Sequence, residues 1–215
     1  LKKNSNNLIL MDQIKKLIKS QPPIAQLSSH NLLAIEGMNK NEILALINRA
    51  DYFADLETSQ IKKFLEGYVV LNVFFENSTR TRVSFEVAGK RLGADVINIS
   101  VNTSSIKKGE SLLDTANTLS AMKPDLLIVR HPESGAPKLF SEYLNCSIVN
   151  AGDGRHEHPT QALLDALTIR RKLGEIEGLK ISICGDIANS RVARSNIHLL
   201  TTLGAQVKCV APPTL

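Results

Sequence analysis

The fold is decided at Phe75-Glu76-Asn77-Ser78-Thr79-Arg80-Thr81-Arg82, where a strand pattern gives way to a helix pattern. The run before this point, residues 68–75, is rich in Val, Leu and Phe, as buried strands are. After it, apolar residues recur at helical spacing at Phe85, Ala88 and Leu92, and Gly93 is a typical helix stop. A strand that leads directly into a helix is the repeating unit of parallel α/β proteins.

The turn between this strand and this helix is suited to an anion. Ser78 is a good N-cap residue, so the first free N–H groups of the helix are expected to face a ligand. These donors and the helix dipole favour a phosphate, and hydroxyl and guanidinium groups gather on the same turn. They belong to Ser78, Thr79, Arg80 and Thr81. From these residues alone, an ordinary capped helix with solvated arginines is the alternative.

Strand and helix patterns continue to alternate along the chain. Helices are predicted at residues 39–55, 79–92, 111–122, 136–143, 159–173 and 191–203, and strands at 68–75, 95–99, 126–129, 147–150, 180–184 and 206–210. Ser111 and Asp114 have the spacing of a capping box, and Pro159 suits the first turn of a helix. The alternation predicts an α/β fold with parallel sheets and helices on both faces.

The chain is expected to contain two doubly wound parallel-sheet domains, of which the second is incomplete. Residues 1–26 are an N-terminal extension, residues 27–158 a first domain and residues 159–215 part of a second domain. The last segment contains a single complete βαβ unit, whereas a typical domain has about 100–150 residues.

One rule of such sheets groups residues that are far apart in the chain. Ligands bind beyond the carboxyl ends of parallel strands. Residues 78–81, Arg130 and the loop of residues 150–158 each follow directly after a predicted strand. We therefore expect them to meet at one edge of the sheet and to form one site.

The composition disfavours several classes of protein. With 43% hydrophobic and 22% charged residues, the chain is typical of a soluble globular protein, and no apolar run approaches membrane-span length. The net charge of +5 is modest and the arginines fall in separate motifs, so neither nucleic acid nor a membrane is expected as a partner. A short basic helix with Ile14, Leu17 and Ile18 would pack on the body, with a membrane surface as the less favoured alternative. No targeting signal is visible, which predicts a cytoplasmic location.

Neither a disulfide nor a metal site is expected. The three cysteines, Cys146, Cys184 and Cys209, are widely spaced in apolar, strand-like surroundings and are predicted to be reduced core residues. His156 and His158 are two residues apart, a spacing that suits a metal only on a strand. They lie in a predicted loop flanked by Gly and Pro, with no cysteine nearby, which disfavours zinc.

Five stretches of the chain resemble, in order, the aspartate and ornithine carbamoyltransferase family. They are residues 75–86, 104–110, 129–132, 150–154 with 158–161, and 185–186 with 190–195. The resemblance extends over about residues 27–215. Asn77 and Thr160 stand where the ornithine enzymes usually carry lysine and cysteine, and residues 190–195 resemble the aspartate enzymes. Aspartate is therefore the implied second substrate, with ornithine as the alternative.

The resemblance implies a reaction that needs no cofactor. The carbamoyl group of carbamoyl phosphate would pass to the amine of L-aspartate, giving N-carbamoyl-L-aspartate and phosphate, a step of pyrimidine biosynthesis. The acyl phosphate is already activated. Catalysis must hold two anions together, polarise one carbonyl and stabilise charge on the departing phosphate.

The family's site residues carry over to matching positions of this sequence. Those implied to bind phosphate are Ser78, Thr79, Arg80 and Thr81. Arg130 would contact the phosphate and the carbonyl oxygen, and His158 would polarise the carbonyl together with Thr81 and Arg130. Gln161 would hold the carbamoyl NH2 group through its side-chain oxygen, and Arg191 would pair with a carboxylate of aspartate. His131 and His156 are expected to be structural.

The resemblance also implies a homotrimer with shared sites. In the family, the loop that matches residues 104–110 reaches the site of a neighbouring subunit, where Ser104 and Lys108 would contact phosphate. Lys108 would also serve catalysis and aspartate binding, and regulatory chains are further candidate partners. From the residues alone, Lys107 and Lys108 are predicted to lie in a solvated loop.

A second hypothesis follows from the length of the sequence. In the family, further residues that bind aspartate, and a helix that returns to the first domain, come after the point where this sequence stops. The chain could therefore be a piece that binds carbamoyl phosphate without turnover.

Overall fold

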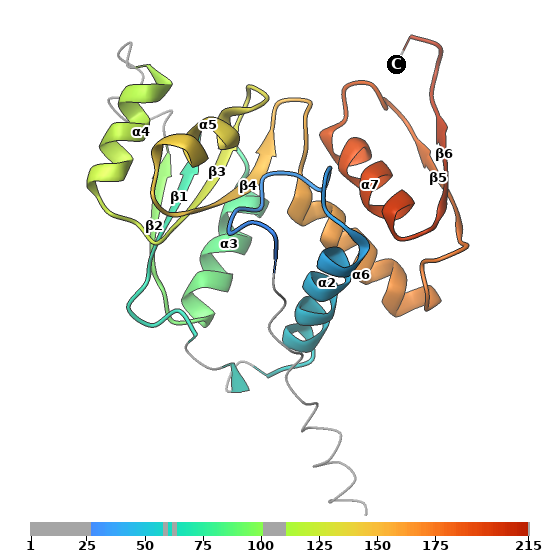
Figure 1. The fold of residues 1–215 in the computed structure, drawn as a ribbon, viewed down its shortest axis with the longest axis horizontal. Coiled ribbons are helices and arrows are strands. Elements are labelled where there is room, and N and C mark those ends of the chain that lie inside the picture. Colours follow the sequence, from blue (N-terminus) through green and yellow to red (C-terminus); the bar gives the residue numbers. More distant parts are fainter. Residues whose placement is uncertain (1–26, 58–59, 62–63, 101–110, 215) are drawn as a thin grey trace, which may run out of the picture.

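The computed structural model describes residues 27–57, 60–61, 64–100 and 111–214, and helices and strands alternate there in an α/β fold (Figure 1). The strands are β1 (Val69–Phe74), β2 (Asp95–Ser100), β3 (Leu126–His131), β4 (Ser147–Asp153), β5 (Lys180–Cys184) and β6 (Gln206–Val210). The helices are α2 (Lys40–Ala54), α3 (Thr79–Arg91), α4 (Leu112–Ala121), α5 (Ala136–Tyr143), α6 (Pro159–Leu173) and α7 (Arg191–Thr202). The predicted helix around Ile14 lies outside the described residues.

The larger sheet is parallel, with the strand order β2-β1-β3-β4. Successive residues of β1 face opposite sides: Leu71 joins a core beneath α4 and α5 that contains Phe140, whereas Val70 joins a core on the α3 side that contains Ile128. Phe74 at the end of β1 is paired with Arg130 of β3. The turn after β1 and Arg130 therefore share one edge of the sheet.

The smaller sheet pairs β5 with β6 in parallel. Helix α6 lies between α2 and α7 (Figure 1), in a core that joins Ile43 of α2, Ala166 of α6 and Leu199 of α7. This core holds α7, with Arg191 at its first position, against the rest of the chain. The two sheets lie on either side of residue 158 in the sequence, and the division into domains at that residue stays a prediction.

Helix starts follow the capping signals of the sequence. The hydroxyl of Ser111 accepts the Asp114 N–H at 3.2 Å, and the Asp114 carboxylate accepts the Ser111 N–H at 3.0 Å, so the predicted capping box is confirmed. Asn39 and Glu42 form the same arrangement at the start of α2. Pro159 is the first residue of α6, also as predicted.

The cysteine prediction is correct for one residue and wrong for two. Cys146 is buried at the start of the larger sheet, but Cys184 and Cys209 are exposed. Every residue of β5 and β6 is exposed or half-buried, because in the described chain these strands pack against helices on one face only. An apolar strand pattern does not reveal whether both faces are covered.

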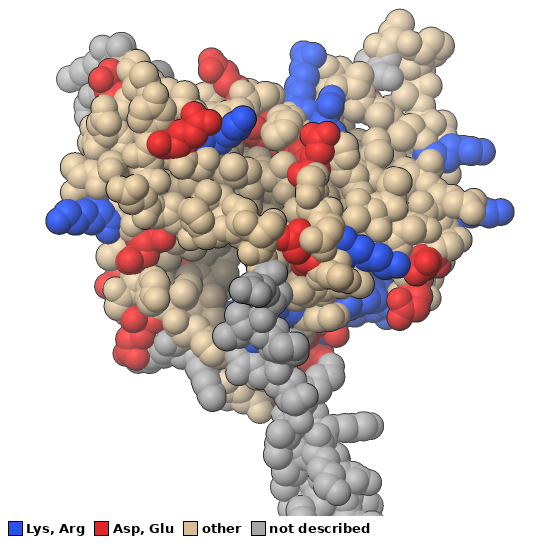
Figure 2. Space-filling view, viewed as in Figure 1, with Lys and Arg blue, Asp and Glu red and all other residues tan. Residues whose placement is uncertain are grey.

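Charged side chains of both signs are mixed on the surface. On the face shown in Figure 2, the described Lys and Arg side chains are scattered among Asp and Glu rather than joined in one basic stripe. Among the described helices, none combines the length and apolar character needed to cross a bilayer.

Candidate functional site

A pocket of about 630 Å³ opens at the carboxyl edge of the larger sheet and gathers most of the predicted site residues. Its wall includes Ser78, Arg80, Thr81, Arg130, His158, Gln161 and Arg191. The expectation that the segments after β1, β3 and β4 meet at one edge is confirmed. Thr79, at the first position of α3, is exposed and does not belong to this wall. Ser104 and Lys108 lie outside the described residues.

The start of α3 presents free donors to this pocket. Ser78 occupies the N-cap position as predicted, but the expected capping bond is absent: its side chain makes no bond to the N–H groups of α3. Its backbone, at φ −154° and ψ 89°, departs from the usual extended cap conformation. The hydroxyl and the first N–H groups of α3 therefore stay available to an anion.

Two arginines converge on one carboxylate at the pocket. Nε of Arg130 lies 2.6 Å and Nη2 of Arg191 lies 2.5 Å from the same oxygen, Oε1 of Glu76. The Arg130 Nε group is buried and makes no well-aligned hydrogen bond to the described residues, so its contact with Glu76 is an ion pair only. Burial, then the charge of Arg191, lowers the pKa of Arg130, and Glu76 opposes that shift. Arg130 and Arg191 therefore place two positive charges at the pocket, and Glu76 places one negative charge between them.

The sequence interpretation assigned no role to Glu76, although Glu76 lies in the stretch that decides the fold. The available signal was an acidic residue that directly follows a strand and precedes Arg80 and Arg82 in the same stretch. Its partners could not be read from the sequence, because Arg191 is 115 residues away in the chain.

His158 is buried in the same wall and is held neutral. Only 6% of its surface is exposed, and burial, reinforced by the charges of Arg130 and Arg191, lowers its pKa to about 4. Oγ1 of Thr160 lies 3.4 Å from Nδ1, and when that hydroxyl donates to Nδ1 the imidazole proton is on Nε2. A neutral imidazole with that proton is a hydrogen-bond donor for a ligand in the pocket.

Comparison with known proteins decides the family. The family model described as "Aspartate/ornithine carbamoyltransferase, carbamoyl-P binding domain" matches residues 30–171, about two thirds of the chain. The chain belongs to the aspartate/ornithine carbamoyltransferase family. The resemblance inferred from five short motifs is thereby confirmed.

Individual carbamoyltransferases of known name are similar over most of this chain. The aspartate carbamoyltransferase catalytic subunits of Granulibacter bethesdensis and Gluconobacter oxydans are 61% and 60% identical over 187 residues, 86% of this chain. This chain spans only 59% and 60% of those two relatives. Aspartate transcarbamoylase of Trypanosoma cruzi in complex with carbamoyl phosphate aligns with a TM-score of 0.81 and 39% identity, over 91% of this chain and 61% of that one. The catalytic subunit of M. jannaschii aspartate transcarbamoylase aligns at 0.79 and 42% identity, over 87% and 62% of the two chains.

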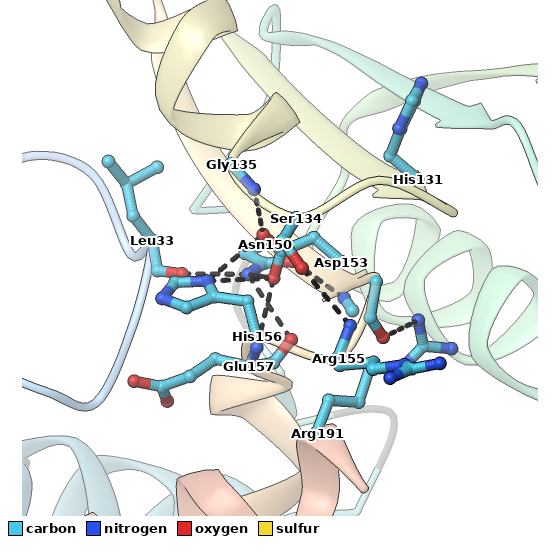
Figure 3. A network of polar contacts seen from close by, with 12 residues as sticks. Leu33, His131, Ser134, Gly135, Asn150, Asp153, Arg155, His156, Glu157 and Arg191 are labelled. Atoms are coloured by element: carbon cyan, nitrogen blue, oxygen red, sulfur yellow. Dashed lines mark hydrogen bonds and ion pairs between the residues drawn. The ribbon is translucent and has the colours of Figure 1, made fainter. Parts of the chain in front are cut away.

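A network of buried carboxylates supports the segment between β4 and α6 that leads to His158 (Figure 3). Asp153, 1% exposed, accepts the N–H groups of Gly135 at 2.7 Å and Glu157 at 3.1 Å. The side-chain NH2 of Asn150 donates to Asp153 and to the Leu33 carbonyl, both at 2.8 Å. These bonds tie the loop after β4 to two other segments.

Glu157 performs the same task one residue before His158. Its side chain is fully buried, and its carboxylate accepts the N–H groups of Ile35 at 2.8 Å and Glu36 at 2.9 Å and the hydroxyl of Ser195 at 2.7 Å. The Ser195 oxygen in turn accepts the His158 N–H at 2.8 Å. The sequence interpretation missed this carboxylate, because each of these partners is more than 30 residues away.

His131 and His156 make contacts that fit the structural role expected of them. Nδ1 of His131 accepts the Glu133 N–H at 3.0 Å, its ring packs against Phe75, and burial lowers its pKa. Nδ1 of His156 lies 3.1 Å from Asp153. Donor atoms of His156, Glu36 and Glu157 lie within 4.8 Å of one another, but both oxygens of Glu157 already accept backbone N–H groups. We assign no metal to that cluster.

Gly152 permits the close approach of two pocket residues. Its φ of +110° disfavours other residues, and an added Cβ would lie 3.1 Å from Nε of Arg191 and 3.2 Å from Cδ2 of His158. We expect Gly152→Ala to displace both side chains and to weaken phosphate binding about tenfold or more, measured by calorimetry. Gly178→Ala is the matched control, because Gly178 has a φ of +79° and no atom within 4 Å of the added Cβ. Equal phosphate affinity in the two variants would contradict the role of Gly152.

Proposed function

We propose that this chain is the carbamoyl-phosphate-binding part of an aspartate carbamoyltransferase catalytic subunit. The reaction transfers the carbamoyl group of carbamoyl phosphate to the amine of L-aspartate, giving N-carbamoyl-L-aspartate and phosphate for pyrimidine biosynthesis. The observation that carries the proposal is the pocket itself, in which the free start of α3, two arginines and a neutral histidine converge. The T. cruzi relative has been solved with carbamoyl phosphate and with carbamoyl phosphate and aspartate together, which supports both substrates.

The phosphate end of the substrate would lie at the start of α3. Ser78 and Thr81 supply hydroxyl and N–H donors there, and Arg80 and Arg130 supply charge. Charge-assisted hydrogen bonds contribute about 1.5–3 kcal/mol each, so a few of them suffice for useful affinity. The exposed Thr79 would contribute its backbone N–H group rather than a wall contact.

The carbonyl of the substrate would face His158. When the amine nitrogen attacks, a C–N bond forms, the C–O bond to phosphate breaks, and negative charge develops on the carbonyl oxygen before the phosphate departs. The neutral imidazole keeps its Nε2 proton and donates to that oxygen, with Thr81 and Arg130 as further donors. The amine proton leaves with the phosphate or to water, so His158 is not required as a base.

Aspartate would bind on the α7 side of the pocket. Arg191 would pair with a carboxylate of aspartate, as its Nη2 group does with Glu76, to which it donates at 2.5 Å. Among the described residues, α7 supplies only Arg191 and Val192 to the pocket wall, and β5 and β6 supply none.

The partners of the proposed enzyme follow from the same resemblance. A homotrimer in which Ser104 and Lys108 complete a neighbour's site is proposed, with regulatory chains as further candidates and a cytoplasmic location. No cofactor enters the reaction. Ornithine is disfavoured as the second substrate, because the relatives at about 60% identity are named as aspartate enzymes.

Binding of carbamoyl phosphate without turnover is the second candidate function of this chain. It is favoured by one observation, that among the described residues α7 contributes only Arg191 and Val192 to the pocket wall, and β5 and β6 contribute nothing. The two candidates share the phosphate pocket and differ only in whether aspartate can be held.

One experiment separates these candidates. We expect the chain to bind phosphonoacetamide, a stable analogue of carbamoyl phosphate, by calorimetry, and to form no carbamoyl-aspartate. The same chain, continued with the corresponding C-terminal part of the Granulibacter bethesdensis relative, should bind the analogue and turn over. Turnover by the chain alone, within tenfold of the continued chain, would reject the binding-only candidate. No binding by either protein would reject the proposed function.

A further inference from the structure

Gln161 is held by a carboxylate that lies outside the pocket. Gln161 and Asp165 are one turn apart on α6, and Nε2 of Gln161 donates to Oδ1 of Asp165 at 2.9 Å. Gln161 lines the phosphate pocket, whereas Asp165 lines a second pocket of about 450 Å³ against β5 and α7. The pair therefore stands in the wall between the two pockets, and only Gln161 reaches the first one.

The other oxygen of Asp165 is also occupied. Oδ2 accepts Nδ2 of Asn196 on α7 at 2.8 Å, and the same Nδ2 donates to the carbonyl of Val192 at 3.1 Å. Asn196 is only 8% exposed. Because two acceptors share its NH2 group, Asn196 is fixed as a donor toward Asp165.

This arrangement determines which end of the Gln161 side-chain amide faces the phosphate pocket. An ionised carboxylate only accepts hydrogen bonds, so the amide must turn its NH2 group to Asp165. The acceptor end, Oε1, is then the end left for a ligand. Because the Asp165 carboxylate cannot donate, its chemistry alone fixes this orientation of the Gln161 amide.

We infer that Asp165, fixed by Asn196, is a positioning residue that orients the Gln161 amide so that the site selects a carbonyl bearing an NH2 group over one bearing a methyl group. The inference rests on the proposed function, since it assumes a carbamoyl group in this pocket. Asp165 itself makes no contact with the substrate. Its effect on binding passes entirely through the orientation of Gln161.

The substitution Asp165→Asn tests this with almost no change of shape. An asparagine offers one oxygen and one NH2 group to two donors, Gln161 and Asn196. Asn196 is held as a donor by the Val192 carbonyl, so the new oxygen faces Asn196 and the new NH2 group faces Gln161. The Gln161 amide must then turn over and present its own NH2 group to the pocket.

The probes are two stable phosphonates that differ in one group. Phosphonoacetamide carries NH2 on its carbonyl, and acetonylphosphonate carries CH3 at the same place. The wild-type chain should bind the amide more tightly, and Asp165→Asn should lower the ratio of the two affinities about 3- to 10-fold, the equivalent of one neutral hydrogen bond. A change in the charge of the pocket affects both phosphonates alike, so the ratio reports the carbonyl substituent alone.

A swap and a control complete the design. In the double variant Asp165→Asn with Asn196→Asp, the carboxylate at 196 accepts the NH2 of residue 165, whose oxygen again faces Gln161. The ratio should recover in part, because the new carboxylate also faces the Val192 carbonyl, to which it cannot donate. Asp186→Asn removes a carboxylate from the same second pocket without touching Gln161 and should leave the ratio unchanged. If Asp165→Asn does not fold, as judged by circular dichroism, Asp165→Ala replaces it, because a Gln161 without a fixed partner also loses selectivity.

The outcomes distinguish a failure of the proposed function from a failure of the role inferred for Asp165. Wild-type protein that binds neither phosphonate overturns the proposed function and this inference with it. Wild-type protein that prefers the amide, with the same ratio in Asp165→Asn, leaves the proposed function standing and overturns the role of Asp165. A lowered ratio that the swap restores in part supports that role, and a lowered ratio that Asp186→Asn reproduces overturns it.

Discussion

His158→Ala should lower the turnover number about 100- to 1000-fold in the chain continued to the length of its relatives, because one donor to the developing oxyanion is lost. The affinity for phosphonoacetamide should change only a few-fold, since Ser78, Thr81 and the arginines of the pocket wall are the groups proposed to hold the phosphate end. The bond from residue 158 to Ser195 uses the backbone N–H and survives the substitution. Steady-state kinetics with calorimetry on the same variant separates the two effects.

His156→Ala is the matched control for this prediction. His156 lies two residues before His158, is partly exposed, and contacts Asp153 rather than the pocket. Its removal should leave the turnover number within about threefold of the parent. If His158→Ala kept a near-normal turnover number, or if both variants lost it equally, His158 would be a structural histidine and the proposed oxyanion donor would have to be sought elsewhere.

The pocket at the carboxyl edge of the larger sheet was predictable because its parts follow rules that act over short distances. The apolar run before Phe75 and the helical spacing after Ser78 place a strand and a helix with little ambiguity. Parallel strands then bring their carboxyl ends to one edge, so Arg130 and His158 had to meet the start of α3. Family resemblance supplied the chemical roles, and the structure supplied the shared pocket.

The charged partners that hold this site were not predictable from the sequence. Glu76 lies in the most informative stretch, yet its ion pairs depend on tertiary structure: the one with Arg130 on the pairing of β1 with β3, and the one with Arg191 on the packing of α7 against α6. Asp165 received no role from the sequence, and its link to Asn196 crosses 31 residues. Burial depends in the same way on tertiary packing: Cys184 was expected in the core and is exposed because its strand is covered on one face only.

Glu157→Ala should be among the most destabilising single substitutions in the chain, because it leaves several buried groups without a partner. The N–H groups of Ile35 and Glu36 and the hydroxyl of Ser195 would all lose their acceptor. Each buried group left unpaired costs about 1–3 kcal/mol, so a loss of roughly 3–5 kcal/mol in the free energy of unfolding is expected. That is a large share of the stability of a typical protein, about 5–15 kcal/mol. Urea unfolding followed by circular dichroism measures it.

Two further variants assign that loss to the carboxylate. Glu157→Gln keeps the shape and one acceptor oxygen, so its cost should be smaller, about 1–3 kcal/mol. Glu36→Ala removes an exposed side chain next to the same bond and should cost less than about 0.5 kcal/mol, because the backbone N–H of residue 36 is unaffected. A Glu157→Ala protein within 1 kcal/mol of the parent would show that water or a shifted backbone replaces the carboxylate. If the expected order holds, one buried acid fixes the segment before α2, the start of α7 and the backbone of His158 together, and the geometry of the pocket depends on it.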